Sequence, residues 1–159
     1  MKAKSGFTLV EILIVVVILG ILAAIVIPQF TEASSEAKLS SMVTDLQSVR
    51  SQIQLYKINH NDNLPGVANG THTGAAGFVN SLIGKTDVFG NALLITDTTG
   101  YGPYLQRIPT NQFVDSNVVG LGNTAGALPG VVTDGSQGWF FDQDTGSFWA
   151  TSDAAHLNY

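Results

Sequence analysis

The chain has 159 residues, with 7 Lys and Arg, 12 Asp and Glu and no Cys, so its formal net charge is −5. The missing Cys excludes disulfides, iron–sulfur clusters, thiolate zinc sites and a cysteine nucleophile, and the acidic balance argues against binding of nucleic acid through phosphate contacts. Hydrophobic residues make up 45% of the chain and charged residues only 12%, against about 25% charged in an average protein.

The apolar residues gather between Phe7 and Ile27, where Glu11 is the only charged residue. A helix over this segment is about 31 Å long, which matches the thickness of a bilayer core. Lys2 and Lys4 precede it, and no basic residue follows before Lys38. This charge distribution predicts a single-pass membrane protein with a cytoplasmic N-terminus and a remainder that is periplasmic or extracellular.

Two simpler interpretations of this segment are a secretory signal peptide cut after Ala23-Ala24 and a plain N-terminal anchor. A signal peptide has a shorter apolar core, of about 7–15 residues. Neither interpretation explains Glu11, because a charged side chain inside a bilayer is costly and usually has a partner. Neither explains Gly6 immediately before the apolar run.

Residues 6–11 read Gly-Phe-Thr-Leu-Val-Glu, and the apolar run continues to Pro28. A short basic leader, a Gly-Phe pair, a Glu four residues after the Phe and a long apolar run together resemble the N-terminal signal of type IV pilins and type II secretion pseudopilins. The resemblance implies that the helix spans the inner membrane with the head in the periplasm, and that a membrane prepilin peptidase cleaves between Gly6 and Phe7. It also implies N-methylation of the new Phe7 amine and loss of the leader, residues 1–6.

The resemblance also suggests how the segment assembles. Glu11 lies four residues after Phe7, on roughly the same helix face. We hypothesise that Glu11 of one chain meets the Phe7 amine of its neighbour and so sets subunit recruitment and stagger. Gly20 and Pro28 are further assembly candidates: either they cause a mild bend tolerated in lipid or, as the family implies, the stretch between them unwinds in a filament.

After Pro28 the apolar residues become periodic, alternately three and four residues apart, as on one face of an amphipathic helix. This stripe consists of Leu39, Met42, Leu46, Val49, Ile53 and Tyr56. The helix is predicted to end near Ile58, before the breaker cluster 59–63. We therefore divide the chain into a leader (1–6), a transmembrane and assembly helix (7–28), an amphipathic half of the same helix (29–60) and a head (61–159).

The head is rich in Gly and Pro, which is typical of loops and turns. A short helix is predicted over 78–83, a short β-prone stretch over 131–133, and a hairpin from the aromatic runs 138–142 and 146–151. Segments Gly102–Asn111 and Gly138–Thr151 resemble pseudopilin heads. The expected fold is α+β and pilin-like: one long N-terminal helix whose second half packs on a head of three or four short antiparallel strands.

The family resemblance implies a structural calcium near the C-terminal end, but the segment Asn111-Gln112-Phe113 departs from the family pattern there. The candidate oxygen donors are Asp134, Asp142, Asp144 and Asp153. Asp142-x-Asp144-x-Gly146 partly resembles a calcium loop and equally suits an ordinary hairpin turn. His60, His72 and His156 are isolated in the sequence, and we expect no catalytic residue and no other cofactor. Trp139 and Trp149 are expected to pack in the core.

These features predict a structural subunit and not an enzyme. The favoured role is a type II secretion pseudopilin that forms a periplasmic pseudopilus for protein export. The alternatives are a type IV pilin of a surface pilus, serving adhesion, motility or DNA uptake, and a monomeric membrane-tethered binding protein. The expected partners are copies of the chain in a helical filament, the prepilin peptidase and methyltransferase, an inner-membrane assembly platform, minor pseudopilins and the lipid bilayer, without any required contact to nucleic acid.

Overall fold

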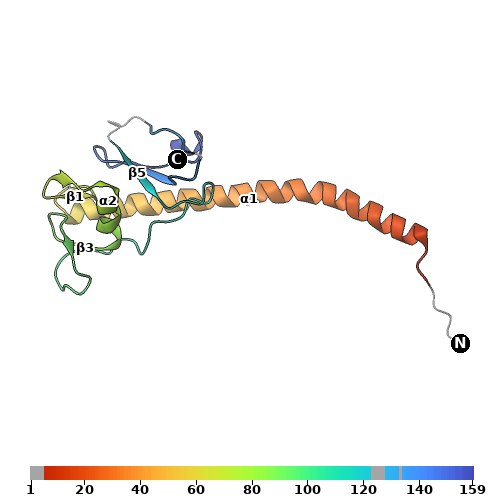
Figure 1. Cartoon of the computed structure of the whole chain (residues 1–159), viewed down its shortest axis with the longest axis horizontal. Coiled ribbons are helices and arrows are strands. Elements are labelled where there is room, and N and C mark those ends of the chain that lie inside the picture. The colour runs from red at the N-terminus through yellow and green to blue at the C-terminus, as the bar shows by residue number, and fades with distance from the viewer. Residues whose placement is uncertain (1–5, 123–127, 133) are drawn as a thin grey trace. The chain divides into compact units, whose positions relative to one another are not determined.

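The computed structural model describes residues 6–122, 128–132 and 134–159 (Figure 1). Predictions about residues 1–5 and Thr133 lie outside the described residues. The chain divides into two compact units, Met1–Leu39 and Ser40–Tyr159. In chain order the elements are α1 (Leu9–Asn59), β1 (Val67–Ala68), β2 (Thr71–His72), α2 (Gly74–Ile83), β3 (Lys85–Thr86), β4 (Ala92–Leu93), β5 (Val119–Gly122), β6 (Trp139–Asp142), β7 (Phe148–Ala150) and a 3-10 helix, His156–Asn158.

The described part of the first unit is residues 6–39, which contain the beginning of α1 and are drawn in red and orange in Figure 1. From Leu9 to Phe30 the large apolar side chains of the helix are exposed, from 42% at Val26 to 82% at Leu9. The helix is long and apolar enough to cross a membrane, as predicted. Because a helix that is apolar on every side has to be covered by something, this segment requires lipid or other helices.

In the second unit the remaining turns of α1 carry most of the predicted stripe. Met42, Leu46, Val49, Ile53 and Tyr56 are buried, which confirms the amphipathic pattern, whereas Leu39, the first predicted member, is half-buried and ends the first unit. The helix ends at Asn59, one residue after the predicted end. Asn61 and Asp62 follow with φ of 52° and 66°, a left-handed conformation that Asn and Asp adopt more readily than other side chains do.

The aromatic hairpin is confirmed. β6 and β7 are antiparallel, with Trp139 opposite Ala150 and Phe141 opposite Phe148. α2 begins four residues before the predicted helix, at Gly74. Its Phe78 packs on Phe141, with ring centroids 4.3 Å apart.

One strand pairing differs from the prediction. The three-stranded sheet has the order β5–β6–β7, and β5 runs parallel to β6, whereas only antiparallel pairs were expected. A parallel pair requires a crossover connection of about a dozen residues or more, and the long stretch between Gly122 and Trp139 supplies one. Val132 forms no strand, although its N–H donates to the carbonyl of Thr151 at 2.7 Å.

The two remaining sheets are small and antiparallel: β1 pairs with β2, and β3 pairs with β4. The core of the unit is aromatic, with Trp139, Phe141 and Phe148 almost fully buried around Phe78. Trp139 also donates its indole N–H to the carbonyl of Pro109 at 2.8 Å. Trp139 therefore packs in the core, as predicted.

Arg50 of α1 ties the C-terminal segment to the helix. Its Nε and Nη2 both donate to the carbonyl of Phe148, at 2.9 and 2.7 Å, and Nη2 also donates to the backbone oxygen of Tyr159. Burial lowers the pKa of the guanidinium, which nevertheless keeps its charge at neutral pH. In a head without Cys, these charge-assisted hydrogen bonds fix β7 and the chain after it to α1.

Candidate assembly site at the N-terminus

The predicted cleavage bond lies just outside α1. Gly6, Phe7 and Thr8 are not helical, and all three are exposed. The helix begins at Leu9, two residues after the predicted start at Phe7. An exposed bond in non-helical chain is the kind of site that a peptidase reaches most easily.

Glu11 is hydrogen-bonded to Thr8. Its Oε2 accepts from the backbone N–H of Thr8 and from the Thr8 hydroxyl, both at 2.8 Å, and the Glu11 N–H donates to Thr8 Oγ1 at 3.3 Å. This is a capping box, in which the residue before the helix and the third helical residue satisfy each other's backbone N–H groups. The capping box therefore fixes both the start of α1 and the position of the Glu11 carboxylate.

Thr8 is a functional candidate that was not predicted from the sequence. The signal was present, because Thr8-Leu9-Val10-Glu11 fits the pattern of Ser or Thr followed three residues later by Glu. Only one carboxylate oxygen of Glu11 is used by Thr8. Within the residues that the structure describes, Oε1 accepts no hydrogen bond and is open to a further donor.

Gly20 and Pro28 both lie within α1, which is helical across both positions. A Cβ added at Gly20 meets no described atom within 4 Å, and the same is true at Gly6. The fold of the described chain therefore gives no reason for glycine at either position. Whether the stretch between Gly20 and Pro28 unwinds in a filament stays a prediction.

The four candidate calcium ligands belong to three separate turns, because Asp142 and Asp144 share one. Asp134 accepts from the N–H of Ser136, and Asp153 from that of Ala155, at 2.9 and 2.8 Å. Asp142 is buried, and its Oδ1 accepts from the N–H of Asp144 at 2.8 Å. Across the described residues no three Asp, Glu or His side chains are grouped as metal ligands, and the calcium prediction is untested.

The three histidines also lie apart. His60 is fully buried and bonded to Thr86, His72 is exposed, and His156 Nδ1 lies 2.8 Å from the hydroxyl of Ser152.

Comparison with known proteins identifies the N-terminal segment. Residues 1–27 match the family model described as the prokaryotic N-terminal methylation motif. A type II secretion system core protein G from Pseudomonas aeruginosa is 42% identical over 59 residues, which are 37% of this chain and 42% of that protein. The core protein G of Vibrio cholerae is 38% identical over 60 residues, which are 38% of this chain and 41% of that protein.

A fimbrial protein from Pseudomonas aeruginosa is 44% identical over 50 residues, which are 31% of this chain and 32% of that protein. The chain spans about two fifths of the length of the two core G proteins. No solved structure matches it. The chain thus carries a prepilin-type N-terminal methylation motif, and its relatives include proteins named type II secretion system core protein G and fimbrial protein.

Proposed function

We propose that this protein is a structural subunit of a pilus-like filament, and specifically a pseudopilin whose filament drives protein export by type II secretion. The observation that carries the proposal is the methylation motif at residues 1–27, placed on a helix whose apolar side chains are exposed. The similarity to core protein G favours the pseudopilin. The proposed role is mechanical and involves no catalysis by this chain.

Processing is the first proposed step. A prepilin peptidase cuts between Gly6 and Phe7 on the cytoplasmic side of the inner membrane, and the new Phe7 amine is methylated. A Cβ added at Gly6 would meet no described atom within 4 Å, so the fold itself does not require glycine there. We therefore assign this glycine to recognition by the peptidase that binds the bond. The cut leaves Thr8 and Glu11 whole, so the capping box survives processing.

Assembly is the second step. The mature chain places a cationic amine one residue before the capping box. Oε2 of Glu11 is held by Thr8, and the free Oε1 receives the Phe7 amine of a neighbouring chain. In a low-dielectric surrounding an unpaired charge is costly, so this pair selects one stagger between neighbours. The apolar helices then cover one another.

Gly20 belongs to the same step. Glycine at an exposed helix position costs about 1 kcal/mol relative to alanine, and no described atom of this chain approaches it. Small residues let helices approach closely in membranes. We therefore assign Gly20 to a close contact with a neighbouring helix, with Pro28 marking the end of the assembly segment.

The test is intact-mass and N-terminal peptide mass spectrometry of the protein extracted from membranes. We expect a chain that begins at methylated Phe7. A chain that begins at Met1 contradicts the proposal and indicates a tethered monomer. A chain cut after Ala24 also contradicts it and indicates a cleaved signal peptide.

A second candidate role is a surface pilus, which the similarity to the fimbrial protein supports. Both filaments use the same processing and the same Glu11 contact, so mass spectrometry does not separate them. Electron microscopy of normally expressing cells does, because surface filaments labelled with an antibody to the head favour the pilus. Secretion that fails when the gene is deleted, without surface filaments, favours the pseudopilus.

A further inference from the structure

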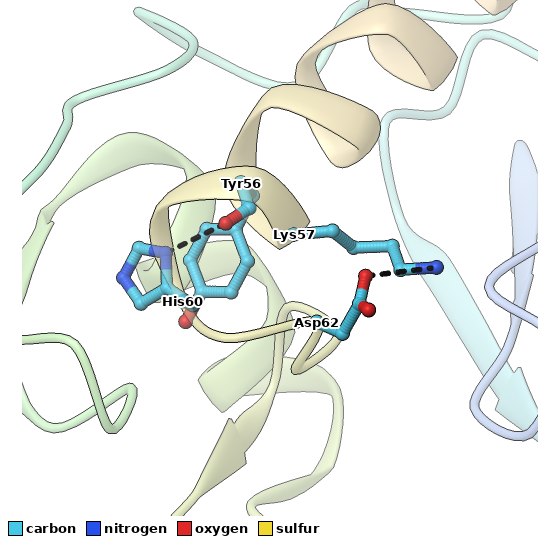
Figure 2. A network of polar contacts seen from close by, with 4 residues as sticks. All are labelled: Tyr56, Lys57, His60 and Asp62. Atoms are coloured by element: carbon cyan, nitrogen blue, oxygen red, sulfur yellow. Dashed lines mark hydrogen bonds and ion pairs between the residues drawn. The ribbon is translucent and has the colours of Figure 1, made fainter.

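His60 is a buried imidazole at the end of α1. It follows Asn59, the last helical residue, and none of its surface is exposed. Its ring stacks flat on the ring of Tyr56, with centroids 3.7 Å apart and an angle of 2° between the planes. Figure 2 shows the two rings face to face beside the last turn of the helix.

Both ring nitrogens of His60 are hydrogen-bonded, and the partners decide the tautomer. Nδ1 lies 2.8 Å from the backbone carbonyl of Tyr56, which can only accept, so Nδ1 carries the proton. Nε2 lies 2.8 Å from the hydroxyl of Thr86 and therefore accepts from it. The neutral imidazole thus satisfies both of its own nitrogens, the Tyr56 carbonyl and the Thr86 hydroxyl. A proton on Nε2 removes the acceptor for the Thr86 hydroxyl.

The surroundings of His60 favour its neutral form. Burial lowers the pKa of the imidazole, and the carbonyl of Tyr56, the carboxylate of Asp87 and the backbone of Asp87 oppose that shift without cancelling it. The other groups that face the ring are phenols: Tyr101 and Tyr104, with centroids 5.4 and 6.1 Å away.

Lys57, the nearest basic group on the same helix, points away from the ring. Its ammonium lies 3.9 Å from the carboxylate of Asp62 (Figure 2).

The partner of His60 connects several segments of the head. Thr86 is buried and ends β3. Its N–H donates to the carbonyl of Tyr101 at 3.0 Å, and the Tyr101 N–H donates back to Thr86 at 2.8 Å. Tyr104 in turn accepts a hydrogen bond from the side chain of Asn59 at 3.0 Å. His60 therefore fastens the segment 85–104, which includes β3 and β4, to the end of α1.

We propose that His60 is an acid-sensitive latch: protonation of its imidazole releases segment 85–104 from the end of α1, while the β5–β7 sheet stays closed. The two regions respond differently because the sheet is held to α1 by Arg50, whose charge does not change in this pH range. Since the proposed function places the head outside the inner membrane, the latch gives the head a local response to mild acid there.

The direction of the pH effect follows from linkage. His60 has a lower pKa in the folded head than in the unfolded chain, where the ordinary value is about 6.5. Its contribution to stability is therefore complete above about pH 6.5 and is lost as the pH falls toward the folded value. Over that interval the population of the opened segment rises by up to about tenfold per pH unit.

Hydrogen–deuterium exchange of the full-length chain in detergent micelles tests the latch at about pH 7.5 and about pH 5. The amides of Asn69 and Tyr104 report on release, because they donate to the carbonyls of Phe89 and Leu82 and so join segment 85–104 to residues outside it. After correction for the intrinsic exchange rate, we expect these two amides to lose up to about tenfold in protection per pH unit. The amides of β6 and β7 are expected to keep their protection. Equal losses in both regions, or no loss at Asn69 and Tyr104, overturn the proposal.

The substitution His60→Gln is expected to remove the pH dependence, because an amide can donate and accept but does not titrate. His72→Gln is the matched control, since His72 is exposed, and it is expected to leave the pH dependence unchanged. If His60→Gln does not fold, the carbon-bound proton resonances of His60 in the wild-type chain decide. A neutral ring below about pH 6.5 supports the latch, and titration at the ordinary value overturns it.

Discussion

The two units of the chain use their apolar residues in opposite ways. In the first, the large apolar side chains of α1 from Leu9 to Ile27 are exposed by at least 42%. In the second, the stripe of α1 from Met42 to Tyr56 is buried, and each of its side chains is at most 2% exposed. One helix therefore contributes to both units, and only the pattern of its side chains changes along it.

This contrast separates assembly from folding. A residue whose side chain contacts nothing in its own chain has little influence on the stability of the head, and its effect should appear when chains associate. A residue in the buried stripe should show the reverse. Substitutions on the two sides of this division are therefore expected to have separate effects, on assembly or on the stability of the head.

The largest effect is expected from Glu11→Gln. Glutamine keeps an oxygen for the Thr8 capping box but removes the charge that we propose for the pair with the neighbouring Phe7 amine. We expect normal cleavage after Gly6 and the loss of nearly all filaments, measured by shearing and electron microscopy. The melting temperature of the head is expected to be unchanged.

The control is Glu36→Gln, on an exposed turn of the same helix, which should assemble normally. If the Glu11→Gln variant forms as many filaments as the wild type, the charge of Glu11 is not needed for assembly. A lower melting temperature of the head in that variant would contradict the division between the two units.

Phe78→Ala is expected to be the most damaging change inside the head. Phe78 is fully buried against Phe141 and Phe148, and truncation of a buried Phe costs about 3–5 kcal/mol. Urea unfolding followed by tryptophan fluorescence measures the loss. Leu19→Ala, in the exposed apolar segment, is the matched control and should leave the same transition in place. A loss below about 1 kcal/mol for Phe78→Ala would contradict the assigned core.

The parts of the fold that were predictable depend on local patterns. The apolar run before Ile27, the stripe from Met42 to Tyr56 and the hairpin around Gly146 each follow from the spacing of residues close together in the chain. The candidate cleavage site was also local, since it consists of adjacent residues.

The features that were missed depend on residues far apart in the chain. Arg50 and Phe148 meet only in the folded head, and nothing near Arg50 in the sequence indicates a bond to a distant carbonyl. His60 was interpreted as an isolated histidine, because its partner Thr86 belongs to another element. The parallel pairing of β5 depends on how a long connection crosses over. Thr8 is the exception, because its capping box was readable in the sequence.

Arg50→Gln is expected to have an intermediate effect. It removes the two hydrogen bonds to the carbonyl of Phe148, and bonds to a charged group contribute about 1.5–3 kcal/mol. We expect a loss of that order in urea unfolding, with faster hydrogen exchange in β7 and the segment after it. Arg107→Gln is the control, because Arg107 is exposed and should change stability by less than about 0.5 kcal/mol. Equal stability of the two variants would show that sheet pairing alone holds the C-terminal segment.

The smallest effect is expected from the removal of calcium. Asp134, Asp142 and Asp153 each accept a hydrogen bond from a backbone N–H in a turn of their own. Their carboxylates therefore stabilise these turns without a cation. We expect the head to melt at the same temperature with a calcium chelator and with added calcium. Asp144→Asn should behave like the wild type in both conditions, because the backbone N–H of residue 144, and not its side chain, makes the turn with Asp142. The contrary result is a melting temperature that rises with calcium in the wild type and does not change with calcium in the Asp144→Asn variant. That result would show that the hairpin loop binds the ion, and that calcium and Arg50 together hold the C-terminal end of the head.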